Sequence, residues 1–212
     1  MDFEAARARL IEQLSLEIKD KRVLDAMARV PRERFVPPDR EHLAYEDMPL
    51  PIGLEQTISQ PLIIAMMTQA LELTGDEKVL EVGTGSGYQA AILAELARCV
   101  ITTERFPALA EQARKVLVSL GYTNIEICPA EETLGYHRKA PYDAIMVTAA
   151  APQVPTDLLA QLAIGGRMVI PVGSRHMQEL YKITRTEKKN ITRNLGGCRF
   201  VPLVGKGAWE EA

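Results

Sequence analysis

The chain has few cysteines, few aromatic residues and no long apolar run, and each absence argues against a class of protein. Its three cysteines, Cys99, Cys128 and Cys198, are odd in number and far apart among 212 residues. We therefore expect reduced, packed thiols, with neither a disulfide framework nor a metal site. No apolar stretch approaches the roughly 20 residues of a membrane span. Residues 1–7 are polar and carry no apolar signal core, so we expect a cytoplasmic protein without a membrane partner.

The chain also has no large excess of charge of either sign. A net charge of −3 argues against the broad basic surface of a nucleic-acid-binding protein, so no nucleic-acid partner is expected. With 47% hydrophobic residues, 212 residues suffice for one buried core. No repeat, low-complexity tract or long linker divides the chain. We expect a single domain and a monomer.

The pattern of apolar residues changes twice along the chain. Helical spacing over residues 6–18 and 23–30 stops at Pro31, and the proline-rich segment 32–54 is expected to be mostly irregular. From residue 63 onward, helices and strands alternate, and a final hairpin turns at residues 188–190. The predicted helices are 63–73, 89–97, 107–120 and 156–162, and the predicted strands are 78–82, 100–103, 124–128, 142–147, 167–171, 179–186 and 191–203.

This alternation predicts an α/β fold. We expect a doubly wound, mainly parallel sheet with helices on both faces and an antiparallel C-terminal edge. A helical and irregular N-terminal extension (residues 1–74) would precede the core (residues 75–175), and residues 176–212 would supply the last strands.

Three glycines at alternate positions follow the short apolar run 79–82: Gly83, Gly85 and Gly87. A strand that turns into a helix there leaves backbone N–H groups facing a ligand, and glycine permits the unusual dihedral angles of such a turn. A phosphate-binding P-loop would need a lysine after the last glycine, and none is present. In the dinucleotide fingerprint Gly-x-Gly-x-x-Gly the third glycine comes one residue later than here.

The spacing Gly83-x-Gly85-x-Gly87 resembles class I S-adenosylmethionine-dependent methyltransferases, which implies a Rossmann-like methyltransferase fold and S-adenosyl-L-methionine as cofactor. Glu104 lies 21 residues after Gly83, at the end of the next predicted strand. A carboxylate there would accept hydrogen bonds from the ribose hydroxyls; the alternative is a solvated strand-end glutamate. Glu131 occupies the position where such enzymes often carry an acid near the adenine amino group, although solvated loop acids are common.

Residues 56–61 read Gln-Thr-Ile-Ser-Gln-Pro. This hexapeptide resembles the substrate loop of protein-L-isoaspartate O-methyltransferases, and the resemblance runs through nearly the whole chain. The other matching stretches are residues 30–37, 81–91, 140–145, 147–152, 165–173 and 199–203.

The resemblance implies an enzyme that repairs damaged proteins and peptides. It would methylate the free α-carboxylate of an L-isoaspartyl residue, and the ester would then cyclise to a succinimide. That carboxylate is already ionised at pH 7 and needs no general base, so catalysis would depend on alignment. Ser59 matches the catalytic position, where its hydroxyl would orient the carboxylate. The implied cofactor-binding residues are Thr57, Ile58, Gln60, Glu81, Gly83, Thr84, Gly85, Ser86, Gly87, Glu104, Arg105, Ala130 and Glu131, with no metal ligand.

Two alternatives stay open at this point. One is a methyltransferase of the same fold that acts on a small molecule or RNA. The small residues 148–152 leave room for an extended peptide, which counts against nucleic-acid N-methylation. The other is a catalytically inactive binding module, suggested by Glu55 where the family usually has glycine and by Ala130 and Glu132 where it has glycines.

Overall fold

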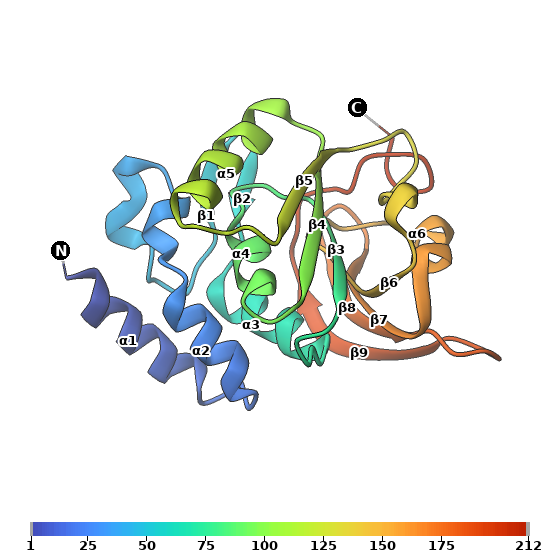
Figure 1. Ribbon diagram of the computed structural model, residues 1–212, viewed down its shortest axis with the longest axis horizontal. Coiled ribbons are helices and arrows are strands. Elements are labelled where there is room, and N and C mark those ends of the chain that lie inside the picture. Colours follow the sequence, from blue (N-terminus) through green and yellow to red (C-terminus); the bar gives the residue numbers. More distant parts are fainter. Residues whose placement is uncertain (1, 211–212) are drawn as a thin grey trace.

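A seven-stranded sheet forms the centre of the molecule in the computed structural model, which describes residues 2–210 (Figure 1). Its strand order is β5-β4-β3-β6-β7-β8-β9. The first five strands in this order are parallel, and β8 and β9 add an antiparallel edge, as predicted. The strands are β3 (Lys78–Val82), β4 (Cys99–Glu104), β5 (Ile125–Pro129), β6 (Tyr142–Val147), β7 (Leu162–Gly173), β8 (Gln178–Thr184) and β9 (Ile191–Cys198).

Both faces of the sheet are covered by helices because its parallel strands are apolar on both sides. In β3, Val79 belongs to a buried cluster with Met67 and Leu93. Its neighbour Leu80 faces the other way and packs in a cluster with Leu158. These partners come from α3 and α4 on one face and from α6 on the other, which confirms the doubly wound fold. The helices of this part are α3 (Pro61–Ala70), α4 (Tyr88–Ala94), α5 (Pro107–Ser119) and α6 (Thr156–Gln161).

The N-terminal extension is more ordered than the proline content predicts. Asp2 and Asp20 begin the two helices α1 and α2 by accepting hydrogen bonds from backbone N–H groups of the first turn. Between Pro31 and Gln60 the chain forms two 3₁₀ helices and an antiparallel hairpin in place of irregular structure. The elements are α1 (Phe3–Leu14), α2 (Lys21–Arg29), η1 (Arg32–Phe35), η2 (Pro38–Leu43), β1 (Leu50–Gly53) and β2 (Gln56–Ile58).

Several predicted bounds differ from the structure. Helix α3 spans Pro61–Ala70 instead of 63–73, and β8 ends at Thr184 instead of residue 186. Three further ends also differ. Helix α4 stops at Ala94, because the chain turns back and the Arg98 amide donates to the Glu77 carbonyl at 3.1 Å. Strand β7 begins directly after α6, five residues before its predicted start. Strand β9 ends at Cys198, where the Phe200 amide donates to the Gln178 side chain at 2.9 Å and so leaves the strand ladder.

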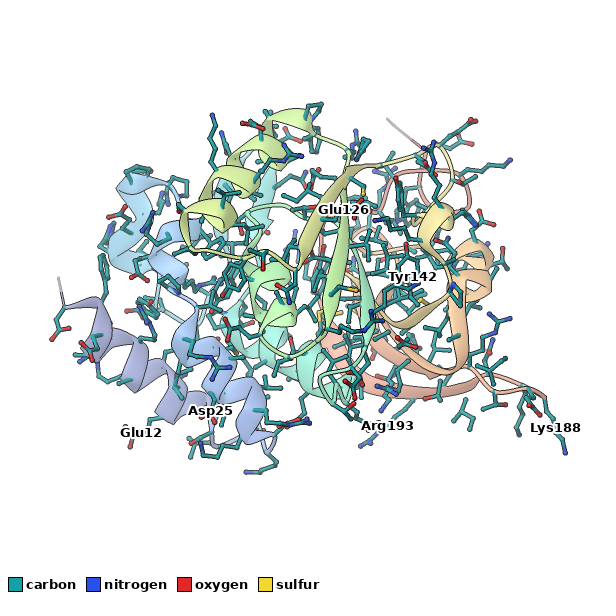
Figure 2. All side chains as sticks on the ribbon, viewed as in Figure 1. Glu12, Asp25, Glu126, Tyr142, Lys188 and Arg193 are labelled. Carbon is teal, nitrogen blue, oxygen red and sulfur yellow. The ribbon has the colours of Figure 1, made fainter. Side chains whose placement is uncertain are left out.

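The side chains follow this layering (Figure 2). Tyr142 lies in the interior beside the sheet, fully buried, and its hydroxyl donates to the Tyr136 carbonyl at 2.6 Å. Lys188 lies at the tip of the β8–β9 turn and is exposed. Across residues 2–210, the helices are too short or too polar to span a bilayer.

Candidate active site

A cavity of about 1090 Å³, part of it open to solvent, lies at the carboxyl ends of the parallel strands. The chain runs outward from β3 to β5 and then returns to β6 beside β3. Ligands of open α/β sheets bind at such a reversal of strand order. The loops after β3, β4, β5 and β6 each contribute walls, and two more walls come from residues 56–59 and 200–204.

The glycine loop after β3 is held by hydrogen bonds from two neighbouring strands. The Thr148 hydroxyl donates to the carbonyls of Val82 and Gly83, at 3.0 and 2.7 Å. The amides of Gly83 and Thr84 donate to the Thr103 carbonyl. Gly83 has φ +103°, and a Cβ there would collide with the Thr148 hydroxyl. Only glycine satisfies both the dihedral angle and the close approach.

Glu104 is the last residue of β4, and its carboxylate is buried. One carboxylate oxygen accepts from the Gly85 amide at 2.8 Å, and the other accepts from the Phe106 amide at 2.9 Å. A carboxylate offers about four acceptor positions. Because Glu104 also lines the cavity, its remaining acceptor positions can receive hydrogen bonds from the hydroxyl groups of a ligand.

Glu81 is fully buried and carries an unsatisfied oxygen. Its Oε2 accepts from the Thr102 hydroxyl at 2.5 Å, and that hydroxyl lies 2.7 Å from the hydroxyl of Thr84. Its Oε1 has no hydrogen-bond partner within residues 2–210. Burial, with a smaller contribution from the charge of Glu104, raises the pKa of Glu81 to about 8. The Glu81 carboxyl is therefore mainly protonated at pH 7 in the ligand-free protein.

Ser59 lines the cavity from the N-terminal extension. Strand β2 ends at Ile58, so the β1–β2 hairpin delivers Ser59 to the cavity wall. Helix α3 begins two residues later at Pro61. The Ser59 carbonyl accepts from Nη2 of Arg32 at 2.9 Å. The hexapeptide thus runs from a strand to a helix within six residues, and its serine lines the same cavity as the glycine loop.

The structure brings most of the predicted site residues together. Gln60 lies outside the cavity wall, where its side chain donates to Asp47 at 2.8 Å. Gly87 also lies outside, packed under the glycine loop toward Ala113 and Leu117 of α5. The predicted residues that do line the cavity are Thr57, Ile58, Ser59, Glu81, Gly83, Thr84, Gly85, Ser86, Glu104, Arg105, Ala130 and Glu131.

Glu131 is not a free loop acid in this arrangement. Its carboxylate forms an ion pair with the Arg138 guanidinium, with 3.1 Å between Nε and Oε1. The Arg138 side chain is 77% exposed, so this ion pair is weak. The Glu131 carboxylate can therefore exchange Arg138 for a ligand in the cavity.

Sequence reasoning missed one whole wall of the cavity. Residues 200–204 line it although the nearest strand, β9, ends at Cys198. The Ala150 amide donates to the Val201 carbonyl, and the Leu203 amide donates to the Ala150 carbonyl, both at 2.8 Å. In the sequence, residues 199–203 stand out only as a stretch that resembles the family, and their place in the cavity wall depends on a pairing across about 50 residues. The other lining residues that were not predicted as site residues are Gln56, Ile64, Met67, Val82, Tyr88, Gln89, Thr103, Phe106, Thr133, Leu134, Gly135, Thr148 and Ala149.

Among residues 2–210, no group of three or more His, Cys, Asp or Glu side chains is arranged to hold a metal ion. The three histidines, His42, His137 and His176, do not line the cavity.

Comparison with known proteins places the chain in a family. The sequence model described as Protein-L-isoaspartate(D-aspartate) O-methyltransferase (PCMT) matches residues 5–208. The Protein-L-isoaspartate O-methyltransferase of Geobacter metallireducens is 53% identical over 212 residues, which cover 99% of this chain and 98% of that protein. The enzyme of the same name from Dictyoglomus turgidum is 53% identical over 216 residues, covering 99% and 98% of the two chains.

Solved structures agree with this placement. A protein-L-isoaspartate O-methyltransferase superposes with a TM-score of 0.84 and 27% identity, over 95% of this chain and 67% of that one. A putative protein-L-isoaspartate O-methyltransferase from Plasmodium falciparum, in complex with S-adenosyl-L-homocysteine, superposes with a TM-score of 0.79 and 26% identity, over 91% of this chain and 95% of that one. This chain belongs to the protein-L-isoaspartate O-methyltransferase family.

Proposed function

We propose that this protein transfers a methyl group from S-adenosyl-L-methionine to the free α-carboxylate of L-isoaspartyl residues in damaged proteins and peptides. The observation that carries the proposal is the shared cavity: the wall of residues 56–59 and the glycine loop after β3 face the same space. A donor bound along the glycine loop and an acceptor bound at Ser59 would therefore meet within it.

The residues of the cavity suit the methyl donor. The unpartnered Glu81 oxygen is the kind of buried acceptor that a ligand with an ammonium group would satisfy. Glu104 and Glu131 both line the cavity. Glu104 has spare acceptor positions that would suit ribose hydroxyls, and we assign Glu131 to the adenine amino group. We assign donor binding to these acids together with Gly83, Thr84, Gly85, Ser86, Arg105, Ala130, Thr57 and Ile58.

The carboxylate that accepts the methyl group has to be aligned with the donor, and no proton has to be removed from it. When bound, S-adenosylmethionine supplies an electrophilic methyl group. An α-carboxylate with a pKa of about 3.3–3.7 is already a nucleophile at pH 7, which fits a cavity that no histidine lines. Ser59 would donate a hydrogen bond to one carboxylate oxygen and so aim the other. Holding reactants in line can contribute about 7–11 kcal/mol to lowering a barrier.

The deciding experiment uses a matched pair of peptides that differ only in containing an isoaspartyl or an aspartyl residue. Purified protein is incubated with radiolabelled methyl donor and each peptide, and base-labile methyl ester is counted. We expect transfer to the isoaspartyl peptide alone. Transfer to neither peptide would refute the proposal, and labelling of small molecules or RNA from a cell extract would then identify the alternative methyltransferase.

We also propose that the chain works as a cytoplasmic monomer, without nucleic-acid or membrane partners. Cys99, Cys128 and Cys198 are all free thiols, which a reducing compartment preserves. One chain supplies every cavity wall described above, with the extension 1–74 bringing the hexapeptide, the core 75–175 the glycine loop, and residues 176–212 the last wall. Sedimentation of the purified protein at micromolar concentration tests the monomer.

A further inference from the structure

Arg32 is a fully buried arginine that donates its hydrogen bonds to backbone carbonyls, and the Asp47 carboxylate is near enough to act on its charge. Its Nε donates to the Ala44 carbonyl at 2.8 Å, and its Nη2 donates to the Ser59 carbonyl at 2.9 Å. The guanidinium carbon lies 4.9 Å from the centre of the Tyr88 ring. Nη1 has no hydrogen-bond partner within residues 2–210. Burying a cation in this way is unfavourable unless its bonds bring a compensating gain.

The bond to Ser59 fixes the backbone at the point where the serine enters the cavity. It orients the peptide unit between Ser59 and Gln60. The next residue, Pro61, has no N–H with which to anchor the chain. Just beyond it, the two carboxylate oxygens of Asp47 accept from the Gln60 side chain and the Leu62 amide, both at 2.8 Å. These three hydrogen bonds hold the backbone around Ser59 from within the N-terminal extension.

The same guanidinium also touches the donor side of the cavity. Tyr88 is the first residue of α4, directly after the glycine loop, and is itself 2% exposed. Its ring packs edge-on against Phe35, with 5.5 Å between ring centres. One planar group therefore contacts both the Ser59 loop and the helix that follows the glycine loop. A lysine would keep the charge but lose the fork of donors that reaches two carbonyls at once.

We propose that Arg32 is a positioning residue for methyl transfer: its guanidinium sets the place of Ser59 relative to the glycine loop. This inference rests on the proposed function. Arg32 does not line the cavity, so it acts only through the residues that it holds. Because misplacement of a reacting group by about 1 Å can lower a rate about 100-fold, the loss of Arg32 should appear in kcat.

A double-mutant cycle with Ser59 tests the proposal. Arg32→Met keeps the length of the side chain and removes its donors, and Arg32→Lys keeps the cation. We expect each to lower kcat for the isoaspartyl peptide about tenfold or more. In the Ser59→Ala background, the same changes should lower kcat less than about twofold, because residues that act through one another are non-additive. A structural defect would instead give multiplying losses in both backgrounds, and that result would overturn the proposal.

Three controls separate the outcomes. Calorimetric binding of S-adenosyl-L-homocysteine shows that each variant is folded. If Arg32→Met does not bind this ligand, Arg32→Lys alone is used in the double-mutant cycle. The matched control is Arg34→Met, an exposed arginine two residues along, which should keep kcat within about twofold of the original. If the unmodified protein fails to methylate the isoaspartyl peptide, the proposed function fails. If it is active and the cycle is multiplicative, or Arg32→Met keeps full kcat, only the positioning role fails.

Discussion

Replacing Glu81 by glutamine should make the ligand-free protein more stable at alkaline pH and leave it nearly unchanged at pH 5. Glu81 is fully buried, and its Oε1 has no partner within residues 2–210. Burial raises its pKa from 4.5 to about 8. Between these values the unfolded carboxyl has lost its proton while the folded one keeps it, so a rise in pH favours unfolding. Glutamine is neutral throughout and still accepts from the Thr102 hydroxyl.

The size of the effect follows from the two pKa values of Glu81, 4.5 and about 8. Each pH unit within that window lowers the free energy of unfolding by about 1.4 kcal/mol. Between pH 5 and pH 8, the original protein should therefore lose on the order of 3 kcal/mol relative to the variant. For a chain of this length, that corresponds to a difference in melting temperature of roughly 6–12 °C.

The assay is thermal unfolding of both proteins at half-unit steps from pH 5 to pH 9, without ligand. Titrating groups that do not interact with Glu81 contribute equally to both curves, so the difference between the curves reports Glu81 together with its interaction with Glu104. Glu187→Gln, an exposed change in the β8–β9 turn, is the matched control and should follow the original protein. Melting temperatures of the Glu81→Gln variant and the original that move in parallel across the range would refute the reasoning.

Three further predictions concern the site and its hairpin. Glu104→Ala should weaken S-adenosyl-L-homocysteine binding about 10- to 100-fold in calorimetry, because charge-assisted hydrogen bonds contribute about 1.5–3 kcal/mol; unchanged affinity would remove Glu104 from the donor site. Ser59→Ala should lower kcat about tenfold or more and keep that affinity within about twofold, whereas equal turnover would make Ser59 structural. Leu54→Asn with Glu55→Gly should raise stability by about 1 kcal/mol, because the two residues have φ +51° and +58° and Asn-Gly suits such a turn; a lower melting temperature would contradict this.

The sheet could be predicted because its strands carry their signal locally. β3 and β6 are short segments in which apolar residues predominate, and their observed bounds, Lys78–Val82 and Tyr142–Val147, match the predicted ones. The β1–β2 hairpin could not be found in this way. It turns through Leu54 and Glu55, neither of which is a residue that usually marks a tight turn, and prolines at positions 49 and 51 disguise its first strand.

The candidate site, too, could be predicted only where its residues adjoin predicted strands. The glycine loop follows predicted strand β3, and Glu104 lies at the end of predicted strand β4. Because the carboxyl ends of parallel strands meet at one edge of the sheet, the fold places them together. Gln60 and Gly87 belong to the same motifs but turn away, because one side chain is taken by Asp47 and the other position packs on α5. Arg32 has the appearance of a solvated residue among prolines, and only three-dimensional packing shows it buried against Tyr88.

The wall of residues 200–204 makes the cavity a late product of protein synthesis. Those residues leave the ribosome after the strands of the sheet, and they reach the cavity by pairing with Ala150 and through the Trp209 amide, which donates to the Leu203 carbonyl at 3.0 Å. A nascent or prematurely terminated chain that stops before this segment can pair β3 through β7 but lacks one side of the site. A complete cavity therefore requires synthesis to have passed the segment 200–204.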